Sequence, residues 1–475
     1  MAEATISTFD AILKEFYLGP IQEQLNNEIM VLQMFQKATV DWNGKIAVMP
    51  VHLGRNSGVE WADESGTLPT AGTQTYQDMR ILSQFLYGRF QITGPAMAAA
   101  GKGGTNSFVG WMDGEMNRLV DDVKNVADRD SVSGGTIKGF IPEYFEINTA
   151  GAGPGPFTGA KSGVAYDGDF TCFAGVVTAT VATWVRINIL RGDTLVSVPL
   201  AAGTEIWVKG ANSAAGTIDL YVNSNPAAVP ALDAEVPATG DLSCPLVVQL
   251  SSVAPVNEAG LGGAPGVAGN GLYVATQAAK QAEGIYGNLA NPTHFTIDRT
   301  TGAANSGAEL QSTLVRGDIT QTPAGAYTRP ALTLQKIQGI MDEVILESGA
   351  STNMLIMNPR QRQMYTGLLQ GTSAGNLYVS TDRAAKGDGG FLGLSYGGVP
   401  IQVSRHCGNG MILFLDTKTW KILELQSGQF ADLDGAVLSR VLNKDSWEGF
   451  YRWYWNIVCG QPNRNAILCG VKLAP

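Results

Sequence analysis

The sequence has few charged residues and few histidines for its length. Charged side chains make up 16% of the 475 residues, and only three positions are histidine. The N-terminus lacks the basic start and long apolar run of a signal peptide, and no apolar run approaches the length of about eighteen residues that a membrane helix needs. The five cysteines form no C-x-x-C pair, which predicts reduced, mostly buried thiols and synthesis in a cytoplasm.

The patterns of common catalytic and metal sites are also missing. No H-E-x-x-H motif occurs. The glycine-rich run from Gly94 to Gly103 has the wrong spacing for a phosphate loop and lacks the Ser or Thr that would bind magnesium. His406 and Cys407 are adjacent, so on a strand their side chains would point to opposite faces. We therefore expect no catalytic residue, no cofactor and no metal site, and hence no enzyme.

The composition limits the other function classes. A net charge of −10 argues against a surface that wraps nucleic acid, because such a surface is basic. The 44% hydrophobic content is typical of a globular chain, and 475 residues suggest two or three packing units. Few charges together with 58 glycines suit a protein that uses much of its surface for contacts and loops.

The most informative stretch runs from Gly44 to Met97. Two β-rich arms, Lys45 to Leu53 and Met79 to Ile92, flank a middle that is rich in Gly, Ser, Thr and Pro. This pattern predicts a long β-hairpin with apolar residues on both faces. A lone two-stranded hairpin of this kind is not stable in water. We expect it to lie on another surface, and neighbouring copies of the same chain are the predicted surface.

Two helices are predicted on either side of this hairpin. In residues 1–43 an apolar stripe begins after Pro20, which suits a first helical position, and continues through Ile21, Leu25 and Ile29. From Asn106 to about Asp128 a second, stronger stripe recurs at helical spacing. The glycines between Gly94 and Gly104 are expected to interrupt the chain between hairpin and helix.

The second half of the chain predicts two further units. Short strands separated by turn residues, without helices, predict an inserted β-rich domain from Thr149 to about Glu258. From Leu332 helices and strands mix. Thr333 is expected to cap a helix, and Asn358-Pro359 to open another after the strand Met354 to Met357. The long aromatic strands near the C-terminus, Trp447 to Cys459 and Asn465 to Leu473, are expected to return together to the long helix.

Four stretches carry a resemblance to a known family: YLGPIQEQLNNE (Tyr17 to Glu28), HLGRNSGV (His52 to Val59), GTLPTAGTQ (Gly66 to Gln74) and YGRFQITGPAM (Tyr87 to Met97). In this order they resemble the N-terminal arm, extended loop and loop return of tailed-bacteriophage major capsid proteins. The resemblance implies an α+β chain with the Hong Kong 97-type capsid fold. It would comprise the arm, the extended hairpin loop, a peripheral domain with a spine helix and an axial domain, with an inserted all-β domain in addition.

The resemblance and the composition shifts together divide the chain into seven parts. They are the N-terminal arm (1–43), extended loop (44–97), peripheral domain with spine helix (98–148), inserted β-rich domain (149–258), return into the peripheral domain (259–330), axial domain (331–430) and C-terminal return to the peripheral domain (431–475).

The implied function is structural. Many copies would assemble as hexamers and pentamers into an icosahedral shell, built in the host cytoplasm, that encloses double-stranded phage DNA without sequence-specific binding. A portal protein, scaffolding and cement proteins are the implied partners, and no membrane is involved. The candidate intersubunit contacts are Arg55, Glu60, Trp61, Glu64, Arg80 and Arg89 on the extended loop, and Phe16, Ile21, Leu25 and Ile29 on the arm.

Two alternatives stay open at this point. An encapsulin-like nanocompartment would use the same fold around enzyme cargo, although the chain length and the inserted domain count against it. A β-rich secreted binding protein or hydrolase built around residues 149–258 is the alternative from a different class. The missing export signal and the missing catalytic constellation argue against that one.

Overall fold

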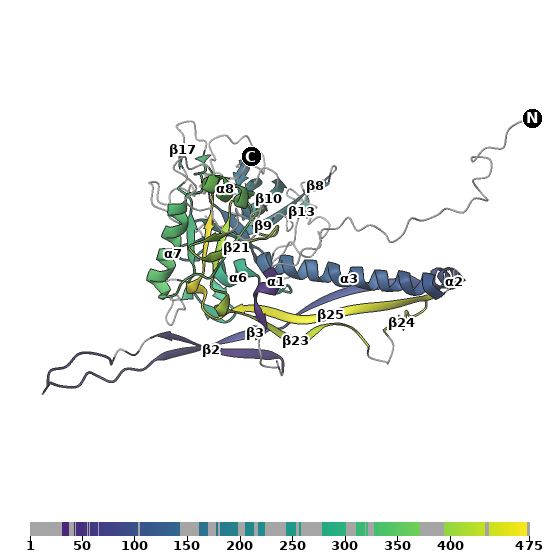
Figure 1. Ribbon diagram of the computed structural model, residues 1–475, viewed down its shortest axis with the longest axis horizontal. Coiled ribbons are helices and arrows are strands. Elements are labelled where there is room, and N and C mark those ends of the chain that lie inside the picture. The colour runs from purple at the N-terminus through teal and green to yellow at the C-terminus, as the bar shows by residue number, and fades with distance from the viewer. Residues whose placement is uncertain are drawn as a thin grey trace, which may run out of the picture.

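The computed structural model has a long arm attached to a more compact block (Figure 1). It describes residues 31–37, 42, 44–54, 56, 58–64, 66–102, 105–142, 161–169, 177–178, 181–197, 205–212, 217–223, 244–252, 256–257, 278–300, 310–318, 320–321, 327–370, 394–432 and 437–472. The predicted arm helix around Ile21 to Ile29 lies outside these residues.

The long arm is a sheet covered on one face by a helix. Its central strand, β25 (Ser446–Cys459), is flanked by β4 (Gln84–Thr93) on one side and by β23 (Trp420–Phe430) on the other. Two short strands, β1 (Gln36–Lys37) and β24 (Ser439–Arg440), pair with β23 and β25 respectively. At about 3.3 Å per residue, β25 alone extends roughly 45 Å.

The covering helix α3 (Thr105–Ser133) confirms the strongest helix prediction and extends it to 29 residues. Val123 and Ala127 bury their side chains against Tyr451, Trp453 and Trp455, which alternate along β25 as period-two geometry requires. The short helix α1 (Val31–Met34) joins this core. The arm is therefore held by one apolar layer between α3 and the sheet.

The glycines from Gly94 onward were expected to interrupt the chain, and β4 does end directly before Gly94, but the helix that follows was not predicted. Residues Gly94–Lys102 form the helix α2. Pro95 stands in the first turn, where a missing N–H costs nothing, and the alanines that follow favour a helix. The Gly94 N–H donates to the carbonyl oxygen of Asp445 at 2.8 Å, which fixes the start of α2 at the far end of β25.

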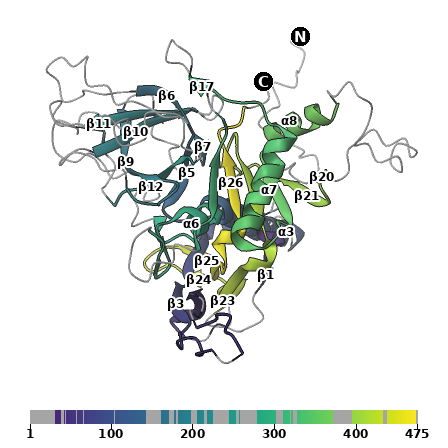
Figure 2. The same cartoon turned by 90° about the vertical axis from the view of Figure 1, so that its left-hand side faces the viewer.

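A six-stranded sheet forms the middle of the block. Its order is β16 (Thr313–Arg316), β26 (Ala466–Cys469), β22 (Ile412–Leu415), β19 (Met354–Met357), β21 (Val399–Val403) and β20 (Ser395–Tyr396). Helices α7 (Leu334–Ser348) and α8 (Pro359–Gln370) lie beside it (Figures 1 and 2). The predicted cap is confirmed, because the Thr333 side chain accepts the Lys336 N–H at 3.2 Å. The strand β19 and the start of α8 also match the prediction.

The third sheet contains nine strands and lies on the other side of the block from α7 (Figure 2). Its main order is β6 (Lys161–Ala165), β11 (Thr217–Asn223), β10 (Glu205–Asn212), β9 (Val181–Arg191), β12 (Leu246–Leu250), β5 (Ile137–Ile141) and β7 (Asp167–Gly168), and β8 (Val177–Thr178) and β13 (Val256–Asn257) pair with β9. Strand β5 precedes the predicted boundary at residue 149. The sheet thus starts directly after α3, and the limits of an inserted domain stay a prediction.

This third sheet is attached to the block through a buried carboxylate. Asp167 accepts hydrogen bonds from the Arg329 guanidinium at 2.9 Å and from the Gly470 N–H at 2.5 Å. Its carboxylate is fully buried, so the ion pair and the backbone donor offset the cost of removing it from water.

Smaller elements complete the described chain. The helix α6 (Ile285–Ala290) is entirely buried in the main core. Short antiparallel pairs are formed by β14 (Thr293–His294) with β15 (Ile297–Asp298) and by β17 (Thr320–Gln321) with β18 (Tyr327–Thr328). Two 3₁₀ turns, η6 (Thr417–Thr419) and η7 (Pro462–Arg464), connect the sheets.

The C-terminal strands do not return together, contrary to the prediction. Strand β25 lies in the arm, whereas β26 crosses into the six-stranded sheet between β16 and β22. Strand β23, expected in the axial unit, makes the opposite crossing and pairs with β25. The chain therefore crosses between the two sheets twice, once through η6 and once through η7.

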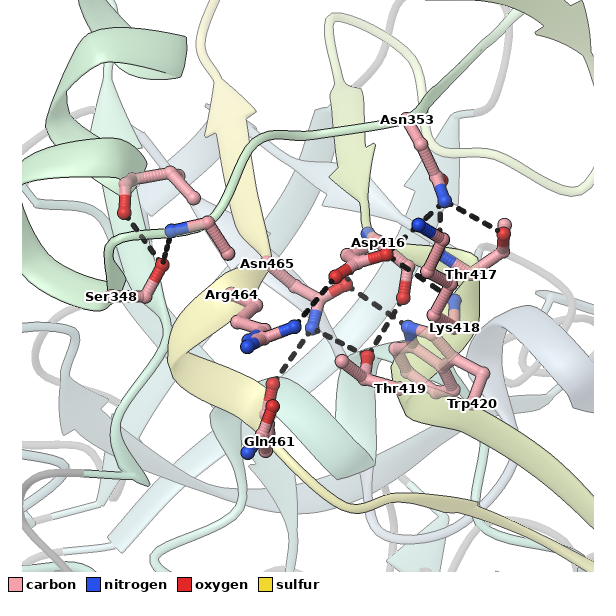
Figure 3. A network of polar contacts seen from close by, with 12 residues as sticks. Ser348, Asn353, Asp416, Thr417, Lys418, Thr419, Trp420, Gln461, Arg464 and Asn465 are labelled. Carbon is pink, nitrogen blue, oxygen red and sulfur yellow. Dashed lines mark hydrogen bonds and ion pairs between the residues drawn. The ribbon is translucent and has the colours of Figure 1, made fainter.

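Buried Asn465 connects these two crossings (Figure 3). Its amide oxygen accepts the Asp416 N–H at 2.9 Å and the Trp420 indole N–H at 3.0 Å, and its NH₂ donates to the Gln461 carbonyl at 3.1 Å. Asp416 also forms an ion pair with Arg464 at 3.2 Å. One side chain thus satisfies groups on both turns.

Replacing Asn465 with leucine is expected to lower the free energy of unfolding by roughly 2–5 kcal/mol, because the Asp416 N–H and the Trp420 indole N–H would lose their acceptor. Urea unfolding followed by tryptophan fluorescence measures the change. The matched control is Asn463→Ala on the same turn, whose half-exposed side chain should matter by less than about 0.5 kcal/mol. Equal effects of the two substitutions would contradict this role.

Alanine substitutions at two glycines test how closely α3 packs on the sheet. A Cβ at Gly88 would lie 2.7 Å from Val123 Cγ2 and 3.0 Å from Leu119 Cδ1, whereas one at Gly114 would meet nothing within 4 Å. Gly88→Ala should therefore destabilise the fold by about 1–3 kcal/mol. Gly114→Ala should stabilise it by up to about 1 kcal/mol through helix propensity. Thermal unfolding of both variants measures the two opposite shifts.

Candidate intersubunit surface

The extended hairpin is shorter on its return side than the sequence predicts. Strand β2 (Ile46–Gly54) pairs with β3 (Thr75–Leu82), in a register that places Val48 opposite Arg80. After buried Ser83 the chain leaves the hairpin and enters the arm sheet as β4, where it pairs with β25. The predicted return arm, Met79 to Ile92, is therefore split between two sheets.

The two faces of the hairpin differ in what covers them. Odd-numbered residues, among them Val51, Leu53, Met79 and Ile81, are buried in a cluster that includes Val458 of the chain's own arm. Even-numbered residues point outward, and the apolar ones among them are exposed: Ile46, Val48, Tyr76 and Leu82. The prediction that neighbouring copies must cover the hairpin therefore applies to the outer face alone, because the inner face packs on its own chain.

The paired strands β2 and β3, which we call the root of the hairpin, are held to the body by hydrogen bonds to the β3 backbone. The Thr296 hydroxyl, between β14 and β15, accepts the Arg80 N–H at 3.1 Å and donates to the Asp78 carbonyl at 2.7 Å. Nearby His294 is fully buried beside the Cys459 carbonyl at 2.9 Å, and burial lowers the pKa of its imidazole to about 3. This side of the hairpin is thus firmly anchored.

The tip of the hairpin projects away from the body (Figure 1). Glu60, Trp61 and Glu64 are exposed, and so is Asp63, whose carbonyl accepts the Gly66 N–H at 2.9 Å in a local turn. The three carboxylates form no ion pair with any residue that the structure describes. The tip combines an exposed indole with three negative charges that have no ion-pair partner in the described part of the chain.

The other predicted contact residues fall into three groups. Arg80 is exposed on the outer face of the hairpin, with its neighbours Asp78 and Leu82. Arg89 lies on β4 rather than on the hairpin, and its guanidinium pairs with Glu448 of the same chain, so it was misplaced by the sequence prediction. Arg55, Phe16, Ile21, Leu25 and Ile29 lie outside the described residues.

The outer face of the arm sheet carries an aromatic group that sequence reasoning missed. Phe85 and Tyr87 are exposed on β4, and Tyr454 of β25 contacts both, edge-to-face with Phe85 at 4.9 Å between ring centroids. The hydrogen bond between the Tyr87 and Tyr454 hydroxyls, 3.0 Å, raises the pKa of Tyr87. The period-two pattern of WEGFYRWYWNIV contained the signal, since Tyr451, Trp453 and Trp455 alternate with outward residues.

A cleft of about 420 Å³ lies where the hairpin root meets the two crossing turns. Val51, Leu53 and Val458 are apolar residues lining it, while Lys418, Lys421 and Arg464 bring positive charge from η6, β23 and η7. Lys418 and Lys421 are exposed and have no ion-pair partner in the described part of the chain. Sequence reasoning missed this cleft because its residues come from four distant segments.

No catalytic arrangement emerges among the residues described. Cys407 is buried, with its Sγ 4.0 Å from the Ile356 carbonyl and 3.9 Å from the Met411 carbonyl, and burial raises the pKa of its thiol well above the ordinary range. The described residues contain no group of three or more potential metal ligands. Within the same residues, no helix has the length and apolar character to cross a membrane.

Two G-x-S-x-G runs have the pattern of a hydrolase nucleophile elbow. The run from Gly371 to Gly375 lies outside the residues that the structure describes. The second run extends from Gly393 to Gly397. Its Ser395 lies in β20, which turns through Gly397 and Gly398, both with positive φ, directly into β21. A nucleophile elbow requires a turn from a strand into a helix. This run is a β-hairpin and does not present a nucleophile.

Comparison with known proteins agrees with the capsid resemblance. Residues 258–470 match the model of the SU10 major capsid protein family. A chain of the cyanophage A-1(L) capsid matches 98% of this chain over 99% of its own, with 8% identity and a TM-score of 0.53. The resemblance to tailed-phage major capsid proteins is confirmed. The α+β Hong Kong 97-type capsid fold is confirmed with it.

Two further solved structures match with lower scores. The capsid of a native GTA particle matches 99% of this chain over 100% of its own, with 10% identity and a TM-score of 0.48. Mycobacterium phage Adephagia matches with 10% identity, full coverage of both chains and a TM-score of 0.42. Among curated proteins, no sequence matches this capsid-like chain.

Substitutions on the two faces of the hairpin are expected to change the free energy of unfolding by different amounts. Val48 is 55% exposed on the outer face, whereas Met79 is 0% exposed on the inner one. Met79→Ala should lower the free energy of unfolding of the isolated chain by about 2–5 kcal/mol, because it opens a cavity. Val48→Ser should change it by less than about 0.5 kcal/mol. Chemical unfolding of dissociated subunits distinguishes the two, and similar losses would mean that both faces are packed within one chain.

Proposed function

We propose that many copies of this chain assemble as hexamers and pentamers into an icosahedral shell around the double-stranded DNA of a tailed phage. The capsid fold and the match of residues 258–470 to a major capsid protein family support a shell protein. The virion is then its location, and assembly takes place in the host cytoplasm.

The hairpin is the observation that carries this proposal. Its inner face is anchored on its own chain, while its outer face and its tip present apolar side chains to water. Exposed apolar surface of this kind is covered in a protein's working state. Neighbouring copies would cover it, and each contact, weak singly, is reinforced by the many others in a closed shell.

The contact between a projecting hairpin and a different surface of the next copy is heterologous. Heterologous contacts close into rings when the rotation between copies allows it. The same contact can therefore serve in both pentamers and hexamers, with small changes in angle. The arm residues Phe16, Ile21, Leu25 and Ile29 are proposed to add a second contact of this type.

The acidic balance of the chain suits a wall that encloses DNA without binding its sequence. A net charge of −10 leaves packaged DNA free of strong attachment to the wall. A portal protein, scaffolding and cement proteins are proposed partners, on the resemblance alone.

Size-exclusion chromatography with electron microscopy tests the proposal. The purified chain should give closed particles of tens of nanometres, or free hexamers and pentamers. Particles isolated from phage-producing cells should carry DNA, seen as excess absorbance at 260 nm that is sensitive to DNase after the shell is opened. Enzyme cargo in place of DNA would favour an encapsulin-like compartment. A monomer at every concentration would refute the shell.

A further inference from the structure

We propose that the hairpin tip of one copy docks in the cleft at the hairpin root of the next copy, with Trp61 as its anchor. This inference rests on the proposed shell function and names the surface that receives the hairpin.

The cleft has the chemistry of a receptor for an acidic, aromatic segment. Its apolar lining includes Val51, Leu53 and Val458, and it is also lined by Lys418 and Lys421, which form no ion pair with the described residues. Gln461 and Asn463 also line it and can accept a hydrogen bond from an indole N–H. Its volume of about 420 Å³ is large enough for an indole together with part of its backbone.

The tip offers the complementary groups within five residues. Trp61 is fully exposed and is flanked by the carboxylates of Glu60, Asp63 and Glu64, which are unpaired among the described residues. Tryptophan is among the residues that most often dominate binding energy when they enter a pocket. Opposite charges at the rim would fix the orientation of the indole and disfavour wrong partners.

A chain cannot fill its own cleft with its own tip. The cleft is lined by β2 itself, at Met49 to Leu53, and the tip extends from that strand away from the body (Figure 1). The occupant that the structure offers is therefore the tip of a second copy. Because donor and acceptor are different surfaces, every copy can give one tip and receive another.

The cleft is also preorganised for binding. The turns that carry Lys418 and Arg464 are fixed by Asn465, and Arg464 is oriented by its ion pair with Asp416 at 3.2 Å (Figure 3). The hairpin side is fixed by Thr296 through its two backbone hydrogen bonds. A preformed site loses little conformational entropy when its partner arrives.

Charge reversal with rescue tests the pairing. A cleft variant (Lys418→Glu with Lys421→Glu) and a tip variant (Glu60→Lys with Glu64→Lys) should each raise the subunit concentration needed for assembly by at least about tenfold, since like charges would meet. Combining all four substitutions restores opposite charges and should return it to within about threefold of the original. In the matched control, the tip variant carries Lys444→Glu and Lys472→Glu in place of the two cleft substitutions. These two exposed lysines do not line the cleft, so the control should not restore assembly.

A cross-linking experiment locates the tip directly. Trp61 is replaced by the photoreactive aromatic residue p-benzoylphenylalanine, isotopically light and heavy subunits are assembled together, and cross-linked peptides are mapped by mass spectrometry. Mixed-isotope cross-links to residues 49–53 or 458–464 support the docking. Assembled shells in which residue 61 cross-links elsewhere, or in which the combined reversal shows no rescue, overturn it while leaving the shell function intact. Failure of the unaltered chain to assemble overturns both.

Discussion

The hydrogen bonds of one buried amide, Asn465, hold the two halves of this molecule in register. The chain crosses between the arm sheet and the six-stranded sheet through η6 and again through η7, and Asn465 bonds to groups on both sides. The two sheets also share one buried apolar cluster, in which Leu413 and Ile467 join Trp420 and Trp455. The hydrogen bonds of Asn465 hold the two turns next to each other, and the cleft is built on the same two turns.

The hairpin is attached next to this junction, and its two faces differ in burial. The inner face is committed to the chain's own arm through Met79, Ile81 and Val458, so the hairpin leaves the body in a defined direction. The outer face and the tip are left to water. A flexible loop with the same sequence would fold its apolar residues back on the nearest surface, whereas a hairpin held at its root keeps them available.

Much of the fold could be predicted from the sequence wherever local chemistry decides it. The helical stripe of α3, the Thr333 cap and the strand Met354–Met357 each follow from periodicity or capping, and the structure has them. Pairing partners could not be predicted in the same way. Residues 79–92 read as one strand, and only buried Ser83 marks the point where β3 ends and β4 begins. The residue patterns of β25 and β26 both predict a strand, but neither pattern shows which sheet the strand joins.

The same limit applies to the candidate contact surface. Glu60, Trp61 and Glu64 could be picked out because they are contiguous on a stretch that must project. Arg89 was misplaced because its position depends on the pairing of β4 with β25. The cleft was missed since Lys418, Val458 and Val51 meet only in the folded chain.

The pairing of β4 with β25 has a consequence for synthesis. In the arm sheet Gln84 lies opposite Trp455 and Thr93 opposite Ser446, so strands far apart in the sequence are neighbours. Such distant pairings form late, because the loop between them must close first. The arm sheet cannot be completed before β25 has left the ribosome. A nascent chain therefore lacks a finished cleft until β25 has emerged, which keeps it from receiving another copy before that point.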